Sequence, residues 1–188
     1  MFTNKKNNFH KKKYFMNLAL IQAMRNLGNT GQNPSVGSII VKKGCVIASG
    51  VTSIGGHPHS EKNAIDNSKQ DLSNSDMYVT LEPCSHYGKT PPCVNIIYKK
   101  KIKKVFFSLL NPDERSYNKS KLILQKKGVS VNKNLLNNKV KTFYKSYLKY
   151  KKLKLPFVTC KFAVSKDFYS ISKKKAWITN KFSILEAY

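Results

Sequence analysis

Short apolar segments typical of strands alternate with helical patterns between residues 36 and 132, and this alternation constrains the fold more than any other feature. In chain order we predict a helix over 14–27, two strands within 36–51, a helix over 59–67, a strand over 77–81, a helix from Pro91, a strand over 103–110, a helix over 119–127, a strand over 128–132, and a helix with a linker over 135–154. Strands separated by helices favour an α/β domain in three layers, with helices on both faces of one sheet.

The chain is strongly basic, with 35 Lys and Arg against 9 Asp and Glu and a formal net charge of +26. Such a charge ordinarily suggests a nucleic-acid or an anionic membrane surface. Nearly all of the basic residues are Lys, whereas Arg is the residue preferred for bidentate contacts with phosphates and bases. We therefore interpret the charge as compositional bias and expect no nucleic-acid partner. No apolar run is long enough to span a bilayer, so no membrane partner is expected either.

Four cysteines, at positions 45, 84, 93 and 160, occur in a chain without a recognisable export signal. We expect a cytoplasmic protein, because the small-residue cleavage site of a signal peptide does not follow the basic N-terminal stretch. In a reducing cytosol, a close cysteine pair is more often a metal site than a disulfide. Cys45 and Cys160 lie in apolar segments and are predicted to be core residues.

Cys84 and Cys93 enclose the segment CSHYGKTPPC, and the segment HPHSE lies upstream at 57–61. His59 and Cys93 fall at predicted helix N-termini, where the helix dipole favours a thiolate. One His and two Cys provide three protein ligands, as in catalytic zinc sites, which keep a fourth position open for water. Glu61, two residues after His59, fits the acid/base that moves protons between that water and a leaving amine. H-x-E followed by P-C and a second Cys is close to the signature of zinc deaminases, in which the two cysteines have two residues between them.

Other interpretations of these residues remain open on the motif alone. A structural zinc needs a fourth ligand, for which His86 is the only nearby candidate in the sequence. His57 competes with His59 as the ligand, but the signature places Glu two residues after the metal-binding His and so selects His59. Buried cysteines are also common in protein cores, although a Cys pair in register with H-x-E is hard to obtain by chance.

The segments YFMNLAL, NPSVGSIIVKKG, HPHSEKNAI, MYVTLEPCSHYGKTPPC and KKVFFSLLNP resemble the diaminohydroxyphosphoribosylaminopyrimidine deaminases of riboflavin biosynthesis, in the cytidine-deaminase-like superfamily. The resemblance spans most of the chain, and the long cysteine segment is its most specific part. It implies a three-layer domain around a mixed sheet and a hydrolase that uses Zn²⁺ to deaminate a cyclic amidine. The implied substrate is 2,5-diamino-6-hydroxy-4-(5-phosphoribosylamino)pyrimidine, and the products are 5-amino-6-(5-phosphoribosylamino)uracil and ammonia.

The resemblance also implies which residues contact the substrate. Asn33 in NPSVG matches a family position that contacts the pyrimidine. His86 and Lys89, between the two cysteines, match positions that line the substrate pocket. The metal ligands and the acid/base are the same residues that the motif selects.

Two departures from the family pattern concern substrate binding. The family usually carries a His seven residues before the metal-binding His, where this chain has Thr52. The family's glycine-rich segment, which helps to hold the ribose phosphate, is replaced by NPDERSYNKSK from Asn111. Lys119 or Lys121 is a candidate to bind the phosphate instead.

The predicted organisation is a basic tail over 1–13, a zinc-dependent deaminase domain over 14–153 and a truncated C-terminal remnant over 154–188. The remnant resembles the start of the reductase domain of bifunctional relatives, including its Trp-Ile-Thr turn, with Phe168 where Gly is usual. Such a short piece cannot bury a core of its own, so we predict no reductase activity and expect a separate reductase as a partner. A homo-oligomer stays open as a further partner.

Two other functions compete with this hypothesis. A nucleic-acid substrate, as in tRNA adenosine deaminases, is supported by the charge and opposed by the cysteine segment and the scarcity of Arg. A non-catalytic zinc protein, serving as a scaffold for the reductase, is supported by the altered 111–121 segment and the short tail. A complete zinc site beside Glu61 is the main difficulty for this second alternative.

Overall fold

The computed structural model describes residues 2–164, 166, 168 and 169. The chain divides into two units, Met1–Leu155 and Pro156–Tyr188. The described residues of the second unit contain no helix or strand. The Trp-Ile-Thr turn and most of the predicted remnant lie outside the described residues, so the predicted domain boundaries stay predictions.

The first unit is built on a five-stranded mixed sheet in the order β2-β1-β3-β4-β5. Strand β1 (Gly37–Lys42) pairs antiparallel with β2 (Cys45–Val51) and with β3 (Asp76–Leu81). Strand β4 (Lys104–Leu109) runs parallel to β3 and to β5 (Ser130–Asn132). Each strand lies within or beside a segment predicted to be a strand.

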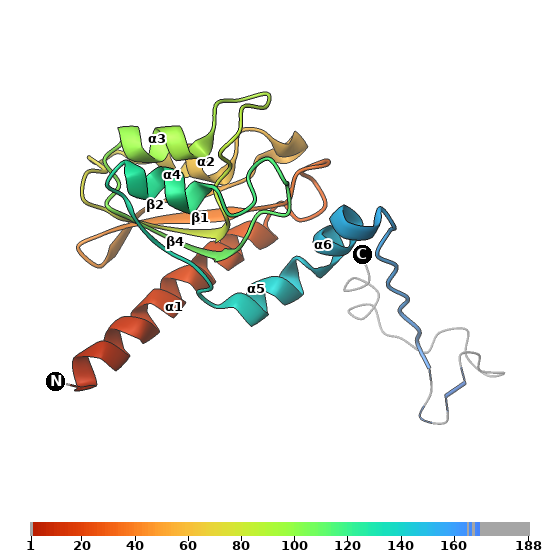
Figure 1. Cartoon of the computed structure of the whole chain (residues 1–188). Coiled ribbons are helices and arrows are strands. Elements are labelled where there is room, and N and C mark those ends of the chain that lie inside the picture. The colour runs from red at the N-terminus through yellow and green to blue at the C-terminus, as the bar shows by residue number, and fades with distance from the viewer. Residues whose placement is uncertain (1, 165, 167, 170–188) are drawn as a thin grey trace. The chain divides into compact units, whose positions relative to one another are not determined.

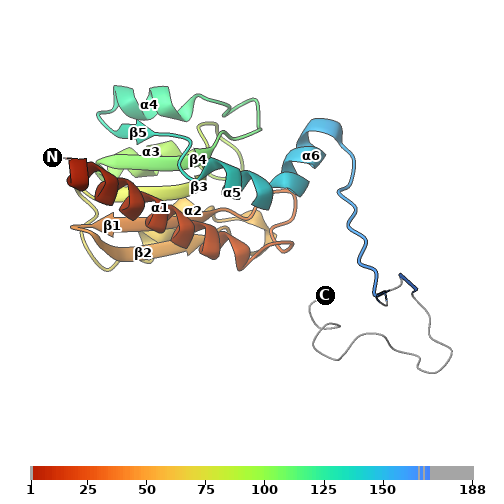
Figure 2. The ribbon, with the colours of Figure 1, turned by 90° about the horizontal axis from the view of Figure 1, so that it is seen from below.

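Helices cover both faces of this sheet, which confirms the predicted three-layer α/β arrangement (Figure 1 and Figure 2). One face carries α2 (Ser60–Asp66), α3 (Cys93–Lys99) and α4 (Ser120–Lys126), and the other carries α1 (Phe2–Met24) and α5 (Asn137–Phe143). A short 3₁₀ helix, η1 (Ile54–Gly56), precedes α2, and α6 (Lys145–Leu153) follows α5. In the part of the chain that the structure describes, no helix is long and apolar enough to cross a membrane.

The central strands are buried on both faces, because successive side chains enter two different hydrophobic clusters. In β4, Val105 and Phe107 pack in the cluster beneath α2, α3 and α4. Phe106, between them, belongs to the cluster on the α1 side, where its ring stacks on Tyr78 at 4.7 Å. Strands buried on both faces have nearly continuous apolar sequences, which explains the runs MYVTL and KKVFFSLL.

Two predictions about local structure are wrong. Helix α1 begins at Phe2, not at residue 14, because no Gly or Pro interrupts residues 2–13 and the helix continues through the basic segment. Cys45 and Cys160 are exposed, not buried. Cys45 directly follows the turn into the edge strand β2, and Cys160 lies in a stretch without helix or strand.

The chain segments that form the candidate site meet at the end of the sheet where the carboxyl ends of β3 and β4 lie. The parallel strands β3 and β4 end there, and the N-termini of α2 and α3 meet there. Helix α2 approaches β2 closely because Gly50 has no side chain; a Cβ at this position would lie 2.3 Å from Ala64 N and from the Ser60 carbonyl oxygen. The crevice beyond the carboxyl ends of strands is the usual ligand site of open α/β sheets.

Candidate metal centre and substrate pocket

Three residues at the carboxyl end of these strands form a candidate metal centre. His59 is the N-cap of α2, Cys84 follows β3, and Cys93 is the first residue of α3. Their ligand atoms lie within 4.8 Å of one another, and His59 Nδ1 is 3.5 Å from each sulfur. One imidazole nitrogen and two thiol sulfurs form a donor set that suits zinc, and three protein ligands leave one position open.

The electrostatics of the two cysteines agree with a metal site. Hydrogen bonds from the Cys93 thiol and from His59 lower the pKa of Cys84, which favours the thiolate form of this sulfur. The hydrogen bond that Cys93 donates to Cys84, together with burial, raises the pKa of Cys93. The backbone N–H of Cys93 also donates to Cys84 Sγ at 3.2 Å. Binding of a metal to such a pair releases the remaining thiol proton.

Glu61 lies beside this centre, in the first turn of α2, and is only 3% exposed. Burial raises the pKa of its carboxyl group, which the nearby His59 partly offsets. The Ser60 hydroxyl donates to Glu61 Oε2 at 3.0 Å and lies 2.7 Å from the Ser38 hydroxyl. Because the single Ser60 proton goes to Glu61, Ser60 accepts the proton of Ser38, and this buried chain fixes one carboxylate oxygen.

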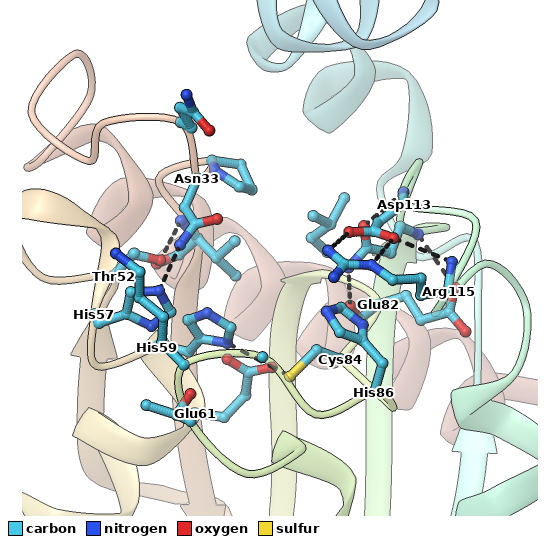
Figure 3. A pocket seen from close by; sticks show the side chains of 18 of the residues that line it. Asn33, Thr52, His57, His59, Glu61, Glu82, Cys84, His86, Asp113 and Arg115 are labelled. Carbon is cyan, nitrogen blue, oxygen red and sulfur yellow. Dashed lines mark hydrogen bonds and ion pairs between the residues drawn. The ribbon is translucent and has the colours of Figure 1, made fainter.

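A pocket of about 290 Å³ opens above the metal centre (Figure 3). His59, Glu61 and Cys84 line it, whereas Cys93 is buried and is not among the lining residues. The structure therefore brings the predicted metal and catalytic residues together. All three predicted substrate contacts also line this pocket: Asn33, His86 and Lys89.

The altered segment at 111–121 forms one wall of this pocket, and sequence reasoning missed the residue that shapes it. Glu82, only 2% exposed, follows β3 directly. It accepts hydrogen bonds from the backbone N–H groups of Asn111, Asn118 and Ser120 at 3.1, 2.9 and 3.1 Å. The Ser120 hydroxyl donates to it at 2.7 Å. One carboxylate thus holds both ends of the loop that replaces the glycine-rich segment.

Ser116, at the centre of the same loop, connects the loop to the cysteine segment. Its hydroxyl is fully buried, accepts a hydrogen bond from the backbone N–H of Ser85 at 2.9 Å, and lies 2.7 Å from His86 Nδ1. The His86 ring is therefore oriented by a residue thirty positions later in the chain. A lone Ser in a polar stretch gives no sequence signal for this role.

The two lysines that were candidates to bind the phosphate do not line the pocket. Neither Lys119 nor Lys121 lines it, whereas Lys89, Arg115 and Lys151 do. Arg115 pairs with Asp113 through two contacts, at 2.9 and 2.6 Å. Lys151 lies on α6 within a Lys-rich stretch, so only the fold could distinguish it from its neighbours.

Helix α6 is held over the pocket by Tyr144, directly before it. The Tyr144 hydroxyl is buried, donates to the Ser35 carbonyl at 2.9 Å, and lies 2.7 Å from Thr80 Oγ1. Tyr147 and Lys151 follow at spacings of about one turn and two turns, so they share the anchored face. Both line the pocket.

Comparisons with known proteins agree with this geometry. Residues 9–109 match the family described as the cytidine and deoxycytidylate deaminase zinc-binding region. The chain is 38% identical to the riboflavin biosynthesis protein RibD of Bacillus amyloliquefaciens over 176 residues, covering 93% of the chain and 47% of that protein. It is 42% identical to RibD of Chlamydia trachomatis over 135 residues, covering 72% of the chain and 36% of that protein.

A solved structure shows the same fold. The crystal structure of a diaminohydroxyphosphoribosylaminopyrimidine deaminase/5-amino-6-(5-phosphoribosylamino)uracil reductase from Thermotoga maritima superimposes with a TM-score of 0.87 at 33% identity. The match covers 96% of this chain and 53% of that one. The chain thus spans about half the length of the relatives it matches.

Proposed function

The chain belongs to the cytidine and deoxycytidylate deaminase zinc-binding family, with RibD proteins among its relatives, and on this basis we propose that it is the deaminase of riboflavin biosynthesis. In the proposed reaction, water and 2,5-diamino-6-hydroxy-4-(5-phosphoribosylamino)pyrimidine give 5-amino-6-(5-phosphoribosylamino)uracil and ammonia. The observation that carries the proposal is the cluster of one His nitrogen and two Cys sulfurs within 4.8 Å, beside a buried glutamate at the floor of a pocket.

In this proposal His59, Cys84 and Cys93 would hold zinc, which would lower the pKa of a water molecule towards ~7. Glu61 would accept a proton from the attacking water molecule while the water oxygen forms its bond to the ring carbon. The same carboxyl group returns the proton to the departing amino group when the C–N bond breaks. Burial raises the pKa of Glu61, which favours the uptake of a proton by this carboxyl group.

We also propose that the phosphate of the substrate lies among Lys89, Arg115 and Lys151. These side chains come from the cysteine segment, the altered loop and α6, and all three line the pocket. Arg115 already donates from Nε and Nη2 to Asp113, so its remaining guanidinium N–H groups are the ones offered to the phosphate. In this proposal they replace the family's glycine-rich phosphate contacts.

The partner and the compartment belong to the same proposal. A close pair of cysteines that binds a metal is more typical of a reducing compartment, which supports the cytoplasm. We propose that the following reduction is carried out by a separate reductase. Purified protein with substrate and NADPH is then expected to release ammonia without oxidising NADPH, and NADPH oxidation is expected only after a reductase is added. NADPH oxidation by this chain alone would contradict that proposal.

The decisive experiment compares Glu61→Gln with Glu114→Gln in the zinc-loaded full-length protein. Glu114 is exposed, so its variant is a matched control for the loss of one carboxylate. Loss of the proton carrier is expected to lower kcat by about 10²- to 10⁴-fold in Glu61→Gln, with the zinc content unchanged. An active Glu61→Gln variant, or wild-type protein with bound zinc and no turnover of this pyrimidine, would contradict the proposal.

A further inference from the structure

The side-chain amide of Asn33 is held in one orientation at the wall of the pocket (Figure 3). Its Nδ2 lies 3.0 Å from the Gly56 carbonyl oxygen and 3.2 Å from His57 Nε2. A carbonyl oxygen only accepts hydrogen bonds, so the atom facing it must be the amide nitrogen. The reverse orientation would bring the Asn33 oxygen against the Gly56 carbonyl oxygen, and that carbonyl would lose its donor.

This orientation determines the tautomer of His57. The first Nδ2 proton goes to the Gly56 carbonyl, so the second goes to His57 Nε2, which must accept it. The proton of a neutral imidazole is then on Nδ1, which is buried without a hydrogen-bond partner among the described residues. Both N–H groups of the Asn33 amide thus donate to protein atoms, Gly56 O and His57 Nε2. Oδ1 is the only polar atom of this amide left for a ligand.

The surroundings leave little room for another arrangement. Gly56 has a φ of +92°, and a Cβ there would lie 2.8 Å from Asn33 Nδ2 and 2.7 Å from the Thr30 carbonyl oxygen. The ring of His57 stacks on that of His59, with centroids 5.0 Å apart and an interplanar angle of 19°. The His57 ring, which contacts Asn33, thus packs against His59, a residue of the candidate metal centre.

Thr52, which stands where the family usually has a His, is not the residue that holds the Asn33 amide. Its hydroxyl is 1% exposed and accepts a hydrogen bond from the Val36 N–H at 3.0 Å. In this chain His57, five residues later, is the imidazole that contacts Asn33.

We propose that His57 is a positioning residue that presents Asn33 Oδ1 to the pocket as an acceptor, so that the site selects ligands with an N–H donor at that point. The inference rests on the proposed function, because the diaminopyrimidine offers amino N–H donors. A ring with a carbonyl oxygen at that point would bring two acceptors together and be rejected, since a buried polar group left unpaired is costly.

The first test is independent of any ligand. In the ¹⁵N-labelled, zinc-loaded full-length protein, long-range ¹H–¹⁵N spectra report which ring nitrogen of His57 carries the proton. The expected result is the Nδ1–H tautomer, together with a shift of the Asn33 side-chain amide resonances in His57→Leu. A His57 ring protonated on Nε2 would overturn the proposal, because that nitrogen could not accept from Asn33.

The second test is a double-mutant cycle for binding of the diaminopyrimidine nucleotide, measured by calorimetry in a Glu61→Gln background that does not turn it over. His57→Leu is expected to raise Kd about tenfold, and His57→Gln, which keeps an acceptor near Nε2, about threefold. In an Asn33→Ala background, His57→Leu is expected to have less than a twofold effect, because it acts through Asn33. Zinc content is the control for the integrity of the metal centre.

The outcomes separate the two proposals. If the Glu61→Gln protein with bound zinc does not bind this nucleotide, the proposed function fails, and the tautomer measurement still decides the role of His57. If the nucleotide binds and His57→Leu weakens binding equally with and without Asn33, the positioning role is overturned.

Discussion

The pocket has two walls that use buried carboxylates in opposite ways. The metal wall, formed by residues 57–61, 84 and 93, contains Glu61, which accepts a side-chain hydrogen bond from Ser60 and faces the pocket. The loop wall, formed by residues 111–120, is organised by Glu82, which accepts four hydrogen bonds, three of them from backbone N–H groups. A carboxylate with all its acceptor sites occupied stabilises structure, whereas one with free capacity can exchange a proton.

The largest effect on stability is therefore expected at the loop wall. Glu82→Ala leaves three backbone N–H groups and the Ser120 hydroxyl without their acceptor, so we expect the free energy of unfolding to fall by about 3 kcal/mol. Urea unfolding of the full-length protein measures this, and the melting temperature should fall by roughly 6–12 °C. Zinc content should be unchanged, because Glu82 is not among the three clustered metal-ligand residues.

Glu114→Ala is the matched control for Glu82→Ala. Glu114 lies on the same loop but is exposed, so its loss should change the free energy of unfolding by no more than about 0.5 kcal/mol. A loss below about 1 kcal/mol in Glu82→Ala would show that water replaces the carboxylate and that the loop does not depend on it.

The same difference explains what could be predicted from the sequence. The metal wall needs particular residue types at particular spacings, so HPHSE and CSHYGKTPPC revealed His59, Glu61 and the two cysteines. The donors of the loop wall are backbone N–H groups, which every residue but Pro carries, so no pattern revealed Glu82. The β-strands were predictable because their apolar runs fill both faces of the sheet. The exposure of Cys45 was not predictable, since the first residue of an edge strand can have the same local sequence as a residue of a buried strand.

The loop wall is also expected to contribute to substrate binding, with a smaller effect than its contribution to stability. Arg115→Ala removes one of the proposed phosphate ligands, so KM for the phosphorylated pyrimidine should rise about tenfold while kcat changes little. The dephosphorylated pyrimidine should bind equally well to both proteins. Steady-state kinetics on the two substrates measure the difference.

Lys119→Ala is the control for Arg115→Ala, because Lys119 belongs to the same loop but does not line the pocket. In Lys119→Ala the KM should stay within about twofold of the wild-type value. Any small rise in KM from the lost positive charge should disappear when salt is added. An equal rise of KM in both variants would mean that the general positive charge, and not a phosphate site, attracts the substrate.

The smallest expected effect is at Ser116, which joins the two walls. Ser116→Ala leaves the Ser85 N–H without its acceptor and removes the contact to His86, so we expect a loss of about 1–2 kcal/mol in the free energy of unfolding. KM should rise about threefold, because His86 then samples several orientations. The value of kcat should stay within about twofold, since Glu61 and the proposed metal ligands are untouched. The measurement is steady-state kinetics beside urea unfolding and zinc content. A fall of kcat larger than the rise of KM would mean that the loop wall reaches the proton-transfer step, and the division of the pocket into a structural and a chemical wall would no longer hold.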